Sequence, residues 1–296
     1  MGCGNYYAAV VIYNQYCKDS ITCKNLKDIC KTESDIKIII ADNSTQEKIK
    51  KANRLQCEEY QWEYRDMEGN KGLSVAYNRI IEKLPRLNNE DCIIWFDDDT
   101  DITGEYFQEL RKCINENPKA EIFVPVIRGL DGKIYSPNER GFFRNHFIKS
   151  RNELIRNKYF NAINSCMAVK TKIYENYHYD EKLFMDMVDQ KFCLDMSEVN
   201  KKFAIINVEV VQNFFQRSNN LTVEKVWTRY NIRIRDFMNY ANTDVFHRWL
   251  GVVKVALWGI DMAIRCKTLK IFFMCIHKSI ECAVELSKST KKKQGE

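Results

Sequence analysis

The amino-acid sequence predicts an α/β fold with a mostly parallel sheet, helices on both faces and a helical extension at the C-terminus. Strand-like and helix-like segments alternate along the first half of the chain, which is the pattern of parallel strands joined by helices. Asn14, Asp42 and Asp97 each follow an apolar strand-like run directly, as expected where a ligand crevice lies at the carboxyl ends of strands. Beyond Trp227 the apolar spacing becomes helical to about Ser287. The 296 residues suffice for one such domain and its extension.

The elements of the first half follow from their local patterns. A continuous β-branched run at 6–13 predicts a buried first strand, and residues 17–31 carry apolar side chains at helical spacing. The second strand, at 36–41, precedes Ser44 and Thr45, either of which can cap the next helix. The later elements are a short strand near 60–64, a helix that opens at 69–72 and runs to about 84, and strands at 92–96, 121–127 and 162–169.

A boundary near Thr243 divides the chain into a catalytic domain at 1–243 and a basic helical extension at 244–296. The net charge is +6, and the extension has ten Lys or Arg against five Asp or Glu, so +5 lies there and +1 in the rest. Part of the excess comes from a basic end at Lys291–Lys293. A basic amphipathic extension favours an acidic partner, either membrane lipid or a lipid-diphosphate acceptor. A solvated lysine face, packing on the catalytic domain and a homodimer remain alternatives, and we expect no nucleic-acid partner.

Twelve cysteines occur without a Cys-x-x-Cys pair, which argues against a zinc ribbon or a thioredoxin-like site. Several lie inside apolar segments, so buried free thiols in a reducing compartment are the simplest account. The N-terminal segment lacks the features of a signal peptide, and charged residues interrupt the C-terminal apolar stretch too often for a membrane span. We therefore expect a cytoplasmic protein, with the basic helices as a candidate contact to the inner face of the cell membrane.

Three consecutive aspartates, Asp97, Asp98 and Asp99, stand at the end of the buried strand at 92–96. Like charges in a partly buried position repel each other, and a divalent cation with oxygen ligands removes that cost. Mg²⁺ or Mn²⁺ held by one or two carboxylates completes its shell with substrate phosphates, which predicts a diphosphate-bearing substrate. Lys71, in a glycine-flanked turn before a helix, is a candidate second positive contact.

A second acidic cluster at 184–196 contains Asp186 and Asp189. These two acids share a face if the segment is helical, and apolar neighbours would raise a carboxylate pKa. A sugar hydroxyl needs a base to accept its proton as it attacks, so this cluster could supply one. An ordinary solvent-facing helix gives the same spacing.

Five motifs in order, VVIYN, IIIADNS, NKGLSVAYN, WFDDDT and LFMDMVDQKFCLDM, resemble glycosyltransferase family 2 enzymes of the GT-A fold, with its Rossmann-like nucleotide-binding half. The pattern is most similar to the bacterial rhamnosyltransferase-like branch and runs from Ala8 to Leu194. The resemblance implies that Asp189 is the general base, with Asp186 positioning acceptor or base. It implies Asp97 and Asp99 as metal contacts, with Asp99 the direct ligand. The implied nucleotide-sugar contacts are Tyr13, Asn14, Asp42 at the base, Asn43, Asn70, Lys71, Gly72, Asn78, Asp97 and Asp98.

The resemblance implies an inverting transfer from a UDP- or dTDP-sugar, with rhamnose as a candidate, to a glycan or lipid-linked acceptor in bacterial surface polysaccharide synthesis. Two positions depart from the family pattern: Gln190 replaces an acid, and Gln212 replaces a histidine and could offer a metal an oxygen. These departures motivate an alternative, a degenerate domain retained as a binding partner or scaffold. A haloacid-dehalogenase-type phosphatase is less favoured, because its acidic motif normally follows the first strand. A nucleotidyltransferase lacks support, because no glycine-rich, arginine-containing loop follows the first strand.

Overall fold

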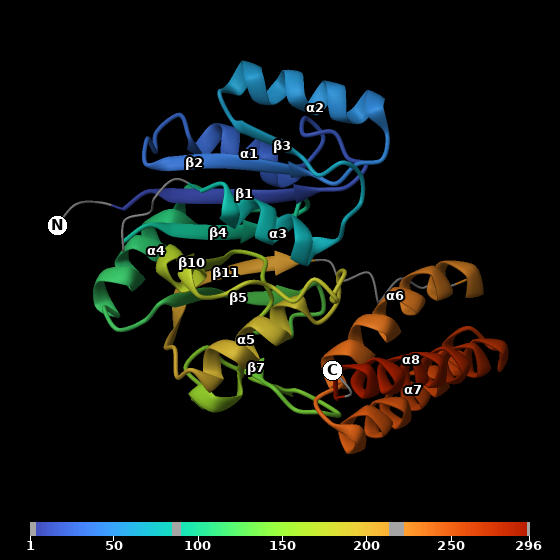
Figure 1. The fold of residues 1–296 in the computed structure, drawn as a ribbon. Coiled ribbons are helices and arrows are strands. Elements are labelled where there is room, and N and C mark those ends of the chain that lie inside the picture. The colour runs from blue at the N-terminus through green and yellow to red at the C-terminus, as the bar shows by residue number, and fades with distance from the viewer. Residues whose placement is uncertain (1–3, 85–89, 213–221, 295–296) are drawn as a thin grey trace. The chain divides into compact units, whose positions relative to one another are not determined.

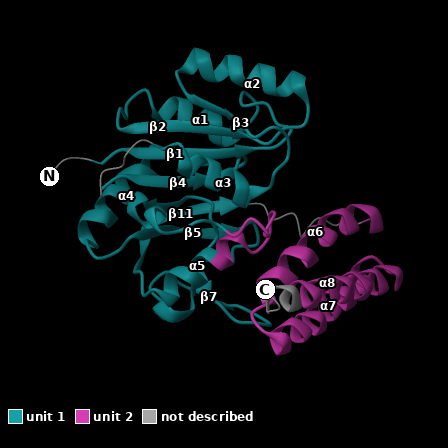
Figure 2. Ribbon diagram, viewed as in Figure 1, with its two compact units in different colours: residues 1–179, 192–214 teal, residues 180–191, 215–296 magenta. Residues whose placement is uncertain are grey.

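The computed structural model describes residues 4–84, 90–212 and 222–294, and for 290–294 the backbone alone, so the side chains of the basic end at 291–293 lie outside the description. The chain forms two compact units (Figure 2). Unit 1 comprises residues 1–179 and 192–214, and unit 2 comprises 180–191 and 215–296. This division differs from the expected boundary at Thr243, because segment 180–191 and the helix before Thr243 group with the C-terminal helices.

Unit 1 is built on one large mixed sheet with strand order β11-β5-β10-β4-β1-β2-β3 (Figure 1). The strands β1 to β4 are parallel to one another, β5 is parallel to β11, and β10 runs antiparallel between β4 and β5. Their bounds are β1 Tyr6–Ile12, β2 Ile36–Asp42, β3 Glu63–Asp66, β4 Cys92–Phe96, β5 Ile122–Gly129, β10 Met167–Lys170 and β11 Phe203–Gln212. The mostly parallel α/β sheet expected from sequence is therefore confirmed.

Shorter strands complete unit 1. The strand β6 (Ile134–Ser136) pairs antiparallel with β5. The strands β8 (His146–Phe147), β7 (Asn138–Glu139) and β9 (Phe160–Asn161) form a separate three-stranded sheet. Two 3₁₀ turns, η1 (Asn157–Tyr159) and η2 (Thr171–Glu175), lie beside β9 and β10 in sequence.

Helices cover both faces of the large sheet, because alternate residues of each strand point to opposite sides. On one face, Ala8, Val10 and Ile94 pack in a buried cluster with side chains of α1 (Ile21–Ile29) and α4 (Gly104–Glu116). On the other face, the Trp95 ring lies 4.2 Å from that of Tyr77 in α3 (Leu73–Glu82), and buried tyrosines extend this aromatic cluster. The remaining helices of this part of the chain are α2 (Glu47–Tyr60) and α5 (Val188–Glu198).

Some predicted element ends were wrong for local reasons. Neither Ser44 nor Thr45 caps α2, whose N-cap residue is Gln46, because Ser44 Oγ instead accepts a hydrogen bond from the Asn14 backbone N–H (2.8 Å). The third strand begins at Glu63 rather than near 60, because α2 continues to Tyr60 and ends with Gln61 in the left-handed conformation (φ 57°).

Unit 2 contains the three long helices α6 (Val223–Ala241), α7 (Val245–Arg265) and α8 (Lys270–Gln294). Asp244 caps α7 by accepting from the His247 backbone N–H (2.8 Å). Glycine permits close packing of α7 on α8, since a Cβ at Gly259 would lie 3.2 Å from Cys275 Cβ and from the Phe272 ring. The predicted C-terminal helices are therefore confirmed, and none of the described helices is long and apolar enough to cross a membrane.

The described cysteines, eleven in number, are all free thiols, and most are buried.

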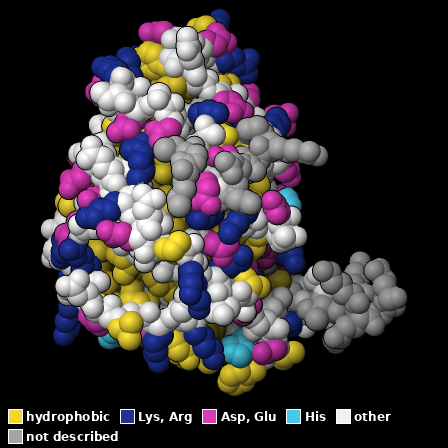
Figure 3. All heavy atoms as spheres, turned by 90° about the vertical axis from the view of Figure 1, so that its left-hand side faces the viewer, with side chains coloured by type: hydrophobic (Ala, Val, Ile, Leu, Met, Phe, Trp, Pro, Cys, Tyr) yellow, Lys and Arg dark blue, Asp and Glu magenta, His cyan; other side chains and the backbone are white. Residues whose placement is uncertain are grey.

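The surface seen from the left-hand side of Figure 1 carries Lys and Arg interspersed with Asp and Glu (Figure 3).

Candidate functional site

Polar residues gather at the edge of the sheet where the parallel strands end. Asp42 is the last residue of β2 and Asp66 the last of β3, and the two are register partners. Asp97 follows β4, Asn14 follows β1, and Gln212 ends β11. Because these strands are parallel, their carboxyl ends meet at one edge, as the positions in the sequence predicted.

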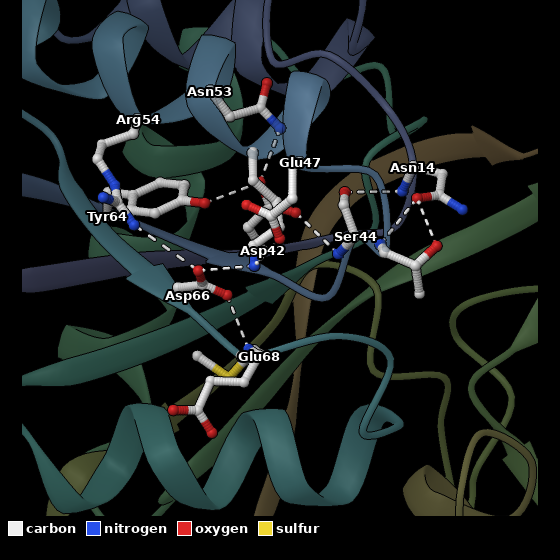
Figure 4. Close-up of polar contacts among 12 residues, drawn as sticks. Asn14, Asp42, Ser44, Glu47, Asn53, Arg54, Tyr64, Asp66 and Glu68 are labelled. Carbon is white, nitrogen blue, oxygen red and sulfur yellow. Dashed lines mark hydrogen bonds and ion pairs between the residues drawn. The ribbon is translucent and has the colours of Figure 1, made fainter.

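Asp42 is fully buried at this edge and is saturated with donors (Figure 4). Its carboxylate accepts hydrogen bonds from the Ser44 backbone N–H (2.9 Å), Asn53 Nδ2 (2.9 Å) and the Tyr64 hydroxyl (3.2 Å). Burial together with this carboxylate raises the pKa of the Tyr64 hydroxyl, which therefore stays protonated and acts as a donor. In this arrangement the buried Asp42 carboxylate fixes the backbone of the turn after β2.

Asn14 ties the turn after β1 to the turn after β2 (Figure 4). Its backbone N–H donates to Ser44 Oγ (2.8 Å), and its side-chain oxygen accepts from the Thr45 backbone N–H (2.9 Å). Asn14 has a positive φ of 49°, a conformation that asparagine tolerates better than most residues. The preceding Tyr13 is 52% exposed, so its ring is available to a ligand.

The loop before α3 is held against the same turn by side-chain amides. Asn43 Nδ2 donates to the Gly72 carbonyl (3.2 Å), Asn43 Oδ1 accepts from the Lys71 N–H (3.3 Å), and Asn70 Oδ1 accepts from the Gly72 N–H (3.2 Å). Gly72 has φ 86°, which a residue with a side chain rarely adopts. Lys71 is exposed at this loop, beside the start of α3.

Asn78 lies elsewhere than expected for a donor contact. It is buried on α3, its Nδ2 donates to the Tyr179 carbonyl (3.0 Å), and its Oδ1 accepts from the Tyr179 N–H (2.8 Å). Asn78 thus holds the backbone of Tyr179, the last residue of the first segment of unit 1.

A pocket of about 380 Å³ lies beside these turns, lined by Ser44, Thr45, Glu47, Lys50, Glu68 and Gly69. Lys50 Nζ forms ion pairs with Glu47 (2.9 Å) and with Asp66 (2.9 Å). Burial acts to raise the pKa of the Asp66 carboxyl, but the bond from Lys50 and one from the Glu68 backbone N–H outweigh it and lower that pKa. The sequence pattern missed Asp66, Asn53 and Tyr64. Asp66 follows the rule of a polar residue at a strand end, but the third strand was placed too early to show it.

Hydroxyl groups at the start of α1 donate hydrogen bonds to backbone carbonyls of the Asp97–Asp99 turn. Thr22 Oγ1 donates to the Asp97 carbonyl (2.6 Å) and Ser20 Oγ to the Asp98 carbonyl (2.6 Å). Ser20 also caps α1 by accepting from the Cys23 N–H (3.1 Å). The turn is therefore fixed by its backbone carbonyls, while the side chains of Asp97 and Asp98 are partly buried and that of Asp99 is exposed.

The carboxylates of this turn carry a strong electrostatic cost. Burial, and secondly repulsion from Asp99, raises the pKa of Asp97 to about 6. Burial and repulsion from Asp99 and Asp97 raise that of Asp98 to about 6 as well. Asp99 itself is exposed. Such a set of hard oxygen donors at one turn fits Mg²⁺ or Mn²⁺, whose charge would offset this repulsion.

Gln212 lies beside Asp97, as the resemblance implied for the position usually held by histidine. Its Nε2 donates to Asp97 Oδ2 (3.2 Å) and to Ser165 Oγ (2.8 Å), and Ser165 Oγ lies 2.9 Å from Thr100 Oγ1. Gln212 therefore holds Asp97 with an amide N–H, while a metal would require its oxygen. Across residues 4–84, 90–212 and 222–294, no three or more His, Cys, Asp or Glu side chains are grouped to hold a metal. A cation at Asp97 and Asp99 would accordingly take most ligands from substrate and water.

Removing one carboxylate should stabilise the metal-free protein at neutral pH. The folded-state pKa of Asp97 lies at about 6, above the unfolded value of about 4, so folding is disfavoured as pH rises through this interval. We expect Asp97→Asn to raise the free energy of unfolding by about 2 kcal/mol at pH 7 and to have little effect near pH 4. Urea denaturation with EDTA measures this, with exposed Asp101→Asn as the control. An equal change at both pH values would contradict it.

The acidic segment of unit 2 is organised around Arg229 and Asp236. Arg229 of α6 forms a bidentate ion pair with Asp186, with Nη2 3.0 Å from Oδ1 and Nη1 in contact with Oδ2. Fully buried Asp236 accepts from the backbone N–H groups of Met185 (2.7 Å) and Asp186 (2.9 Å), and burial raises its pKa. The Arg229 guanidinium is thus bound to a carboxylate, and this ion pair holds Asp186 in place.

Asp186 and Asp189 would share a face only if one helix carried both, and Asp186 lies before the helix that carries Asp189. The helix α5 begins at Val188, and Met187 before it has a positive φ of 65°. Asp189 lies in the first turn of α5, partly exposed, where its Oδ1 accepts from the Gln190 N–H (2.7 Å). A carboxylate at a helix N-terminus is favoured by the helix dipole. Asp186 is thus held by an ion pair with Arg229, and Asp189 lies at the start of a helix.

Comparisons with known proteins bear on this geometry. The sequence matches the family model described as Glycosyl transferase family 2 over residues 8–177, while no curated protein matches it significantly. Mannosyltransferase PcManGT from Pyrobaculum calidifontis, solved with GDP-Man and Mn²⁺, is similar in structure, with TM-score 0.56, 10% identity, and coverage of 97% of this chain and 86% of that chain.

S. aureus TarS is also similar, with TM-score 0.52 and 11% identity over 96% of this chain and 55% of that chain, so the chain spans about half of that TarS structure. For TarS 1-349 in complex with UDP-GlcNAc the TM-score is 0.52 at 11% identity, with 97% and 92% covered. At these identities the likeness concerns the fold.

Proposed function

Because the chain belongs to glycosyltransferase family 2, we propose that it transfers a sugar, with inversion, from a nucleotide-diphosphate donor to a hydroxyl of a glycan or lipid-linked acceptor. The donor is a UDP- or dTDP-sugar, with rhamnose as a candidate sugar. The pathway is bacterial surface polysaccharide synthesis, on the cytoplasmic side of the membrane. The observation that carries the proposal is the clustering of Asp42, Asn14 and Asp97–Asp99 at one edge of the sheet of a family member.

The donor nucleotide is assigned to the turns after β1, β2 and β3. Asp42, Asn53 and Tyr64 form a rigid polar floor there, and Asn14 with Ser44 ties the two turns together. The exposed ring of Tyr13 offers a stacking surface, and the pocket bounded by Lys50 and Gly69 offers space beside it. Asn43, Asn70 and Gly72 shape the loop that brings Lys71 toward the phosphates.

Divalent metal is assigned to the Asp97–Asp99 turn. Asp99, exposed and unencumbered by the Gln212 bond, is proposed as the direct ligand, with Asp97 as the second and Gln212 orienting Asp97. When bound, Mn²⁺ or Mg²⁺ supplies Lewis-acid stabilisation of the departing diphosphate. The mannosyltransferase solved with GDP-Man and Mn²⁺ shows that a similarly folded protein binds such a pair.

Asp189 is assigned as the general base that takes the acceptor proton while the hydroxyl attacks the anomeric carbon. Its position in the first turn of α5 and its place in the family pattern support this choice over Asp186, whose carboxylate is bound by Arg229. Asp186, fixed by Arg229 and by the Asp236 network, is assigned a positioning role for the segment that carries Asp189.

A panel of nucleotides tests the donor assignment. We expect UDP or dTDP with Mn²⁺ to raise the melting temperature, because a ligand that binds the folded state stabilises it. GDP and ADP with Mn²⁺ should have little effect, and so should UDP or dTDP when EDTA replaces the metal. Tyr13→Ala should reduce the shift, whereas Tyr16→Ala, outside the proposed contacts, should preserve it. If no nucleotide shifts the melting temperature, the alternative of a degenerate domain is favoured. The observation that supports this alternative is the hydrogen bond that the Gln212 amide donates to Asp97, a proposed metal ligand.

A further inference from the structure

Helix α7 carries a stripe of large apolar side chains that is exposed along its whole length. Its members are Phe246, Trp249, Val253, Leu257, Ile260 and Ile264, each between 46% and 72% exposed. They recur every three or four residues and therefore lie on one face of the helix. The opposite face is the one that packs inward, since Val255 and Met262 are buried.

Helix α8 repeats the pattern. Leu269, just before it, and Phe273, Ile280 and Val284 within it are 40–68% exposed at the same kind of spacing, while Cys275, Cys282 and Ala283 are buried. The small residues make the internal contacts: a Cβ at Gly251 would meet Met238 and Ala241 of α6, and one at Gly259 would meet Cys275 of α8. Packing within unit 2 is thus already satisfied by other faces of both helices.

The two stripes meet where α7 joins α8. A cavity of about 450 Å³ opens there, lined by Ile260, Ala263 and Ile264 of α7 and by Leu269 and Phe272 around the connection. We call the two stripes together the hairpin face. An exposed apolar surface of this extent marks an interaction site rather than scattered surface residues.

Cations border the hairpin face at its connecting end. Lys267 and Lys270 are exposed and form no ion pair with any residue in the part of the chain that the structure describes. The nearby acids are matched already, since Asp261 lies 3.8 Å from Arg265 and Glu281 lies 3.0 Å from Lys278. Residues 244–296 carry a net charge of +5, as ten basic and five acidic residues.

We propose that the hairpin face docks on a membrane surface that contains anionic lipid, with its apolar side chains in the headgroup–acyl boundary and Lys267 and Lys270 at lipid phosphates. An apolar stripe bordered by unpaired cations complements such a surface in both polarity and charge. A second copy of the chain would bring the same apolar stripes but the same excess of positive charge, so charge complementarity favours lipid. This docking is independent of the donor assignment and would hold the enzyme beside a lipid-linked acceptor.

Flotation of the full chain with vesicles tests this directly. We expect binding to mixed phosphatidylcholine–phosphatidylglycerol vesicles and little binding to phosphatidylcholine alone. Leu257→Asp with Ile264→Asp should lower the partition coefficient about thirtyfold or more. Lys267→Gln with Lys270→Gln should lower it roughly tenfold, and high salt should have a similar effect.

The matched control is Leu55→Asp with Leu154→Asp, two exposed apolar positions of unit 1 that should preserve binding. Circular dichroism checks that each variant is folded. The proposal is overturned if the full chain does not float with the mixed vesicles, or if the Leu257 and Ile264 changes leave flotation unaltered. A dimer in sedimentation that these changes dissociate, without flotation, would instead assign the face to a second copy.

Discussion

Replacing Asp189 with asparagine is expected to lower kcat for sugar transfer about a thousandfold while leaving nucleotide binding nearly unchanged. General-base catalysis contributes about 10²- to 10⁴-fold, and asparagine preserves the shape of the side chain but cannot accept the proton. Asparagine can still accept the hydrogen bond that the Gln190 N–H donates at the start of α5. The loss should therefore be confined to the chemical step.

The measurement is steady-state transfer to a glycan acceptor, with the thermal shift by UDP or dTDP and Mn²⁺ recorded in parallel. Glu198→Gln, an exposed acid at the other end of α5, is the matched control and should retain activity. Transfer by the Asp189 variant within about threefold of the unmodified protein would remove Asp189 from the role of base. Loss of both binding and transfer would indicate a structural role.

Replacing Asp99 with alanine is expected to lower the rate of metal-stimulated hydrolysis of the nucleotide sugar by about a hundredfold or more. A cation that stabilises the departing diphosphate is worth several kcal/mol, and Asp99 is the carboxylate of the turn with the greatest access to solvent. Mutual repulsion among Asp97, Asp98 and Asp99 should fall in the variant, so the metal-free protein should not lose stability. Function and stability are thus expected to change in opposite directions.

Donor hydrolysis and Mn²⁺ titration of the same preparations provide the test. Asp101→Ala, an exposed acid two residues further along that accepts from Asn25, controls for the removal of a surface charge. Equal hydrolysis by the Asp99 variant and the unmodified protein would contradict the metal assignment. If neither turns over donor, with the nucleotide still bound, the degenerate-domain alternative is favoured.

Much of unit 1 could be predicted from the sequence. Continuous apolar runs located β1, β2 and β4 within a residue, and the polar residues after them located the ligand edge, because both are local properties of a strand. The short third strand was misplaced, since its four residues carry little periodicity and α2 occupies the chain as far as Tyr60. That error concealed Asp66.

Other features depend on contacts that no local pattern encodes. The ion pair between Asp186 and Arg229 joins residues 43 apart, and the bond from Gln212 to Asp97 joins residues 115 apart. The sequence pattern left open whether one helix carries both Asp186 and Asp189. The helix α5 starts after Asp186, whose backbone N–H is held by Asp236. The environments of Asp186 and Asp189 therefore follow from packing within unit 2.

The sequence by itself determined the α/β class, the family resemblance and the three aspartates at a strand end, because strand and helix periods and strand-end polarity are written residue by residue. Tertiary structure alone decided which of those polar groups face outward. It buried Asp42 under Asn53 and Tyr64, left Asp99 exposed, and turned the small residues of α7 and α8 inward so that their large apolar ones lie outside. The physical reason is that exposure and pairing depend on neighbours brought together by the fold.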